Sequence, residues 1–150
     1  MRRAFTIVEL LVVMALIALM VGSGAAISLS AGRRKAVEGA AEDLATAMRQ
    51  ARDYVQAGKK DASCAAPLDG WQVKVDADGY TVQGKCGGVY FGNPKKIFSS
   101  GVSTTYNGTV FFNPLSLGTN LESDLTITLT ANGTTPKTVK VTKNGEVNAP

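Results

Sequence analysis

The apolar residues follow two different patterns in the first third of the chain. Residues 5–29 are apolar or small, and Glu9 is the one charge among them. At about 1.5 Å per residue, a helix of that length covers roughly 37 Å. The hydrocarbon core of a bilayer is about 30 Å thick. The first pattern therefore predicts that residues 5–30 form a membrane-spanning helix.

The second pattern begins at Val37. Apolar side chains recur at alternating spacings of four and three, which is the period of a helix with a single apolar stripe. The stripe consists of Val37, Ala41, Leu44, Met48, Ala51 and Val55. A coiled coil would need larger residues, so packing against a sheet of the same chain is favoured. Gly58, followed by two lysines, is typical of a helix end, and residues 31–58 are predicted to continue the first helix.

Alternation of apolar and polar residues replaces the helical period after residue 59. Residues 71–75 and 80–83 alternate on either side of a turn at 76–79, which predicts a hairpin. Gly, Asn, Ser and Pro separate the further strands, which are predicted at 89–91, 109–112, 125–130 and 138–142. Residues 59–150 are therefore predicted to be a β-rich head. The fold class is α+β, with a long N-terminal helix packed against a C-terminal antiparallel β head.

Glu9 and the residues before it need a separate explanation. A carboxylate at membrane depth costs about 2–3 kcal/mol, which points to a function and a partner. The alternative is that Glu9 lies in the headgroup zone and has no role. Arg2 and Arg3 place the N-terminus in the cytoplasm, because basic residues favour that side. The head is then expected outside the cytoplasmic membrane.

The sequence Arg-Arg-Ala followed by Phe-Thr-Ile-Val-Glu-Leu-Leu-Val-Val resembles the class III leader of type IV pilins and type II secretion pseudopilins. The resemblance implies that residues 1–4 are a leader and that prepilin peptidase cuts between Ala4 and Phe5. The same enzyme would then methylate the new amine of Phe5. The family usually has Gly before the cut, where this chain has Ala4. Glu9 corresponds to the glutamate through which one subunit neutralises a neighbour's terminal amine in the filament core.

Two further features lie along the predicted helix. Gly22 and Gly24 weaken a helix in water, and we expect them to form a joint that can unwind in a filament. Arg33, Arg34 and Lys35 have two interpretations. They contact a polyanion or lipid headgroups, or they are a solvated membrane boundary at which long side chains snorkel.

The second half of the chain carries a looser resemblance to the GspH/FimT group of minor pilins and pseudopilins. Residues 110–118 are similar to its phenylalanine-to-glycine segment, and residues 138–147 to its final strand. That strand ends in Gly-Arg-Val in the group, whereas Glu146 stands in place of the Arg here. The family implies a β-rich head packed on the second half of a long helix, which agrees with the order of elements predicted above.

Composition limits the chemistry that the chain can perform. Its 150 residues suit one small domain and an anchor, and they include no histidine. No nucleophile motif, phosphate loop or metal-ligand spacing is present, so no enzyme activity, cofactor or metal is expected. Asp76 and Asp78 suggest calcium, but a plain turn is favoured because the further ligands of a calcium loop are absent. An exported pair of cysteines favours a disulfide between Cys64 and Cys86.

These features lead to a structural function. We expect a pilin or pseudopilin, with a minor subunit favoured, of a type IV pilus-like or type II secretion filament. Its expected partners are prepilin peptidase, other pilins and an inner-membrane assembly platform, and its head is expected in the periplasm. One alternative is a DNA-binding minor pilin, for which Lys137 and Lys143 are the candidate contacts. Another is a simple membrane-anchored or secreted β domain. For the leader alone, the alternative is a standard secretory signal that is cut near Ala25 and Ala26.

Overall fold

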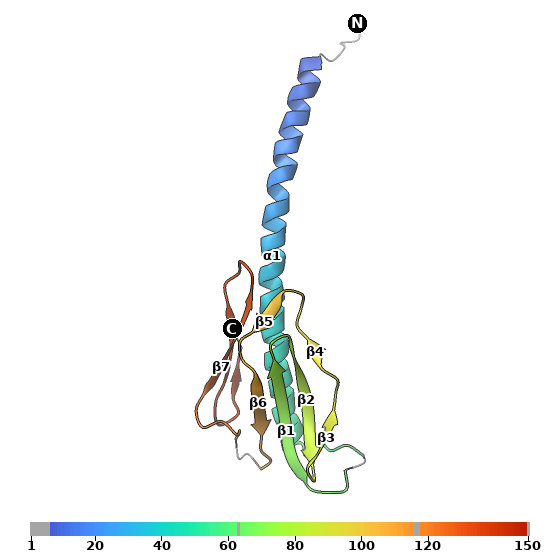
Figure 1. Ribbon diagram of the computed structural model, residues 1–150, viewed down its shortest axis with the longest axis vertical. Coiled ribbons are helices and arrows are strands. Elements are labelled where there is room, and N and C mark those ends of the chain that lie inside the picture. The colour runs from blue at the N-terminus through green and yellow to red at the C-terminus, as the bar shows by residue number, and fades with distance from the viewer. Residues whose placement is uncertain (1–6, 63, 116–117, 150) are drawn as a thin grey trace.

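One helix and a β head make up the described part of the chain. The computed structural model describes residues 7–62, 64–115 and 118–149, and, outside 20–29, their side chains. In these residues a single helix, α1 (Ile7–Gln56), precedes all the strands. The predicted α+β arrangement, in which the N-terminal helix packs on a C-terminal antiparallel head, is confirmed (Figure 1).

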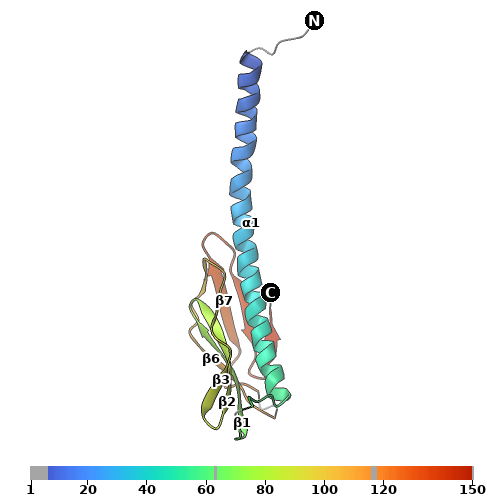
Figure 2. The same ribbon diagram turned by 90° about the vertical axis from the view of Figure 1, so that its right-hand side faces the viewer.

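The helix α1 has 50 residues, which corresponds to a length of about 75 Å. Its C-terminal half lies alongside the head, and its N-terminal half stands clear of it in both views (Figures 1 and 2). The helix is unbroken through Gly22 and Gly24 in this single chain, so the joint predicted for a filament stays a prediction.

The end of α1 has the capping geometry that its sequence predicted. Gly58 adopts a φ of 60°, which is the left-handed conformation that glycine reaches without steric cost. The N–H of Gly58 donates to the carbonyl of Val55 at 3.0 Å, and the N–H of Lys59 donates to that of Tyr54 at 2.9 Å. This pair of hydrogen bonds is a Schellman motif, and it turns the chain back toward the sheet.

The first sheet is antiparallel and contains the predicted hairpin. It orders its strands β3-β2-β1-β6, and a short β4 also pairs with β2. The strands are β1 (Leu68–Asp76), β2 (Gly79–Cys86), β3 (Val89–Gly92), β4 (Lys96–Ile97) and β6 (Gly108–Phe112). Asp76 pairs with Gly79 at the hairpin turn, and Trp71 pairs with Phe112 across β1 and β6.

The second sheet is built from the C-terminal part of the chain and β5. Its order is β5-β7-β8-β9, again antiparallel. The strands are β5 (Val102–Thr104), β7 (Leu125–Ala131), β8 (Lys137–Val141) and β9 (Val147–Asn148). The two sheets meet where the N–H of Thr104 on β5 donates to the carbonyl of Ala77 in the β1–β2 turn at 3.0 Å.

The core lies between the C-terminal half of α1 and both sheets. Every residue of the predicted stripe is buried, with no side chain more than 6% exposed. The facing strands contribute Val73, Val75, Val110 and Phe112 from the first sheet, and Ile127, Leu129, Val139 and Val141 from the second. Small side chains make up much of the helix side of this core, at Ala40, Ala41, Ala45, Ala47 and Ala51.

A disulfide joins the segment after the helix to the first sheet. Cys64 is bonded to Cys86, the last residue of β2, as the pairing of two cysteines in an exported domain predicted. Their Cα atoms are 6.2 Å apart. Closing a loop of this length stabilises the fold by about 3 kcal/mol. The bond fixes the path of the chain between the helix end and β1.

Leu44 tests how far the head depends on α1. Its side chain is fully buried in the core, so we expect Leu44→Ala to lower the free energy of unfolding by about 2–5 kcal/mol. The measurement is denaturant unfolding of the full chain in detergent, followed by the fluorescence of Trp71, the single tryptophan. Glu42→Ala, at an exposed position of the same helix, is the control. Equal unfolding midpoints for both variants would contradict the packing described here.

Candidate assembly surface on the N-terminal half of the helix

The N-terminal half of α1 presents apolar side chains that the head does not cover. Ten large apolar residues between positions 7 and 19 are 48–81% exposed, whereas the stripe residues further along the same helix are at most 6% exposed. They are Ile7, Val8, Leu10, Leu11, Val12, Val13, Met14, Leu16, Ile17 and Leu19. Consecutive positions are apolar, so the surface surrounds the helix. A helix that is apolar all round is normally buried in protein or lipid.

Glu9 is the acidic residue in the first turn of α1, and it is exposed. A carboxylate at this position is favoured electrostatically by the positive end of the helix dipole. The same carboxylate lies among the apolar side chains of the uncovered surface, where any partner that buried it would have to supply a positive charge. The predicted cut between Ala4 and Phe5 falls outside the described residues.

Comparison with known families supports the interpretation of this segment. Residues 1–25 match the family model of the prokaryotic N-terminal methylation motif. The chain thus carries the N-terminal signature of prepilin-type processing. The match ends before Arg33 and does not include the head. It therefore supports a type IV pilin-like protein without selecting the GspH/FimT group. Searches of the curated proteins and of the solved structures gave no significant match.

No described helix combines the length and hydropathy needed to cross a membrane. The membrane-spanning role of residues 5–30 therefore stays a prediction.

The structure does not gather the two lysines that were the candidate DNA contacts. Lys137 begins β8, and its Nζ atom is 3.3 Å from the Oε1 atom of Glu38 on α1. Lys143 lies in the turn after β8, where its backbone N–H donates to Asp124 at 3.3 Å. The two residues are thus at opposite ends of the strand, and Lys140 between them is exposed on the other face. These three lysines form no common basic patch.

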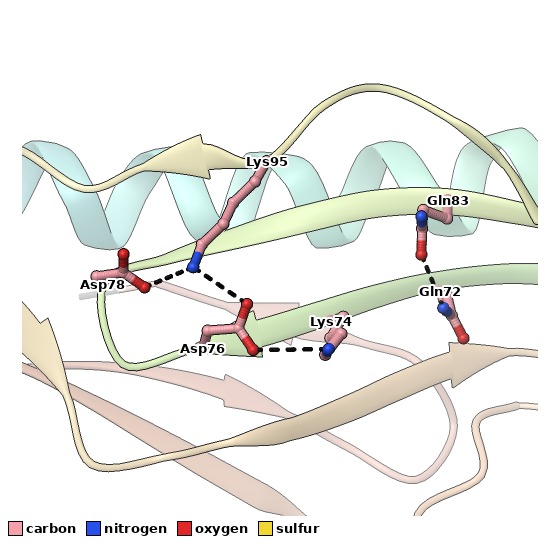
Figure 3. Close-up of polar contacts among 6 residues, drawn as sticks. All are labelled: Gln72, Lys74, Asp76, Asp78, Gln83 and Lys95. Carbon is pink, nitrogen blue, oxygen red and sulfur yellow. Dashed lines mark hydrogen bonds and ion pairs between the residues drawn. The ribbon is translucent and has the colours of Figure 1, made fainter.

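The carboxylates of the β1–β2 turn are held by a lysine. The Nζ atom of Lys95 is 3.2 Å from Asp76 and 2.5 Å from Asp78, and Lys74 is 3.9 Å from Asp76 (Figure 3). The hydrogen bond from Lys95 lowers the pKa of Asp78 and raises the pKa of Lys95. These contacts fasten the β1–β2 turn to the loop before β4.

Two groups of contacts were missed by sequence reasoning. Lys95 contacts the hairpin turn from a different loop, and no local sequence pattern predicts this contact. The second group surrounds the helix end, where Trp71 packs on Tyr54 at 4.7 Å and on Phe91 at 5.3 Å between ring centroids. The indole N–H of Trp71 donates to the carbonyl of Lys59 at 2.9 Å. Together with the disulfide, these contacts hold the end of α1 against the first sheet.

Lys95→Met tests the electrostatic contact at the turn. Removing the ammonium removes the cause of the lowered pKa, so the pKa of Asp78 should rise toward its ordinary value. Because that pKa is depressed in the folded protein, the contact stabilises the fold at neutral pH, and this contribution is lost as the pH falls through the pKa of Asp78. NMR titration of the carboxyl groups measures the shift. The exposed Lys140→Met is the control, and an unchanged Asp78 titration in Lys95→Met would contradict the assignment.

Proposed function

We propose that this chain is a structural subunit, a minor pilin or pseudopilin of the GspH/FimT type, in a type IV pilus-like or type II secretion filament. The observation that carries the proposal is the exposed apolar half of α1, which begins within the matched methylation motif. The role is structural and not catalytic. The head and the second half of α1 share one hydrophobic core, and the first half would supply the contacts with other molecules.

Burial of the apolar side chains on the first half of α1 would be favourable in free energy. Fully burying one large apolar side chain is worth about 1.5–3 kcal/mol relative to leaving it in water. The ten large apolar residues between positions 7 and 19 are 48–81% exposed. We propose that lipid covers them before assembly and that the same half of neighbouring subunits covers them in the filament. The apolar surface surrounds the helix, so both coverings can contact it on every side.

Processing supplies the charge that Glu9 needs when it is buried. Cleavage between Ala4 and Phe5 by prepilin peptidase removes Arg2 and Arg3 and creates a positive amine, which the enzyme then methylates. Two opposite charges 4 Å apart attract by about 4 kcal/mol at an effective dielectric constant of 20. A neighbour's amine at Glu9 would therefore fix the axial register of helices whose apolar surfaces are otherwise interchangeable.

The disulfide and the glycines of α1 are consistent with the same proposal. We place the waiting subunit in the bacterial inner membrane, with its head in the periplasm, where the disulfide between Cys64 and Cys86 persists. An assembly platform would extract it into the filament. Gly22 and Gly24 are the positions at which α1 would unwind in the filament. Glycine has a low helix propensity, so unwinding costs least free energy there.

Glu9→Ala tests the pairing with the terminal amine. We expect the variant to be cleaved and methylated like the wild type, because the cut site is unchanged. Its incorporation into filaments should fall at least ten-fold, since a loss of 1.4 kcal/mol already corresponds to that factor. Immunoblots of membrane and sheared-filament fractions measure both steps. Glu42→Ala removes an exposed carboxylate within the head-bound half of α1 and is the control. Normal incorporation of Glu9→Ala would contradict the pairing.

A further inference from the structure

The excess positive charge of this chain is confined to the flanks of the apolar segment. Residues 36–150 contain eleven basic and eleven acidic side chains, so the net charge of +4 comes entirely from residues 1–35. In that part, Arg2 and Arg3 precede the apolar segment, and Arg33, Arg34 and Lys35 follow it. The cleavage proposed above removes the first pair. The second group is then the one concentration of basic side chains next to the apolar segment.

Arg33, Arg34 and Lys35 form a collar where α1 enters the head. All three are exposed, and Arg33 lies beside the head, where it lines a hollow with Ala131 and Asn132. Successive residues of a helix point about 100° apart, so three in a row cover an arc of about 200° around it. A partner lying along one side of the helix would contact part of this collar. A surface that the helix crosses would contact all of it.

The rim of the head around the collar is uncharged. It consists of the loop at 99–101 and the β7–β8 turn at 131–136, which contain only Ser, Gly, Ala, Asn, Thr and Pro. Ser100, Gly101, Ala131 and Asn132 line a hollow of about 500 Å³ with Gly32, Arg33 and Ala36 of the helix. Arg33 donates to the carbonyl of Asn132 at 3.4 Å, which brings the turn to the collar.

The carboxylate one turn along α1 does not neutralise the collar. Glu38 is 3.3 Å from the ammonium of Lys137 on β8. Lys137 therefore offsets the charge of Glu38 in place of the collar. The distance between the collar and the start of the helix is close to the thickness of a bilayer. The helical rise from Ile7 to Arg33 is about 39 Å, and a bilayer with its headgroups is about 40–45 Å thick.

We propose that the collar and the uncharged rim form a docking surface for an anionic membrane, whose phosphate headgroups the collar binds before assembly. This inference rests on the proposed function, because it requires the apolar half of α1 to lie in the bilayer. Each basic residue near an anionic surface contributes about a five-fold gain in binding, so three contribute on the order of a hundred-fold. The collar thereby keeps the head upright and close to the membrane.

Hydrogen exchange of the full mature chain in lipid nanodiscs tests the docking surface. The discs contain either phosphatidylcholine alone or a mixture with phosphatidylglycerol, and each kind is prepared with one chain and with several chains per disc. We expect the amides of Ser100, Gly101, Asn132 and Gly133 to exchange several-fold more slowly in the anionic discs. The difference should vanish at about 1 M salt, where the Debye length is near 3 Å, and in the triple variant Arg33→Gln, Arg34→Gln, Lys35→Gln.

The matched control is the triple variant Lys74→Gln, Lys85→Gln, Lys140→Gln, which removes three charges from the strands of the head and should retain the lipid effect. Equal exchange in both kinds of disc would overturn the proposal. Slowing that depends on chains per disc, and not on lipid charge, would also overturn it and would assign the collar to a second copy. Failure of the chain to insert into either disc would contradict the membrane step of the proposed function itself, whereas insertion without slowing contradicts the docking surface alone.

Discussion

Among the described residues, α1 is a single continuous helix, and the two sheets of the head cover only its second half. Residues such as Leu44 and Met48 are fully enclosed by two sheets, whereas Leu11 and Leu19 on the same helix are 63% and 73% exposed. The hydrophobic effect acts equally on both halves. The first half is therefore expected to be covered by lipid or by other chains, and this expectation supports the proposed structural role more directly than any feature of the head.

The head is arranged to leave that first half accessible. Small residues on α1 let both sheets close on one part of the helix, the Schellman motif at Gly58 reverses the chain, and the disulfide and Trp71 fasten the helix end. Charges in the head balance one another, as in the contacts of Lys95 with Asp76 and Asp78. The uncompensated positive charge lies beside the apolar segment, where we propose that the membrane meets the chain.

Local patterns predicted much of this fold. The three-four spacing from Val37 to Val55 identified the buried face of α1, and alternation around residues 76–79 identified the β1–β2 hairpin. The order of strands was not predictable, because it depends on contacts between distant residues, such as that of Thr104 with Ala77. The same holds for Lys95, whose partners lie 17 and 19 positions earlier in the chain. For the assembly surface, residue types at the N-terminus carried the signal, and the structure added that the head leaves those residues uncovered.

The central claim is that processing creates the charge that lets Glu9 be buried between subunits. Mass spectrometry of the mature N-terminal peptide tests it most directly. The account predicts a chain that begins at Phe5 and carries one added methyl group on its terminal nitrogen. A mature chain that begins near Ala25, or that retains Arg2 and Arg3, would place the amine away from Glu9 and contradict the account.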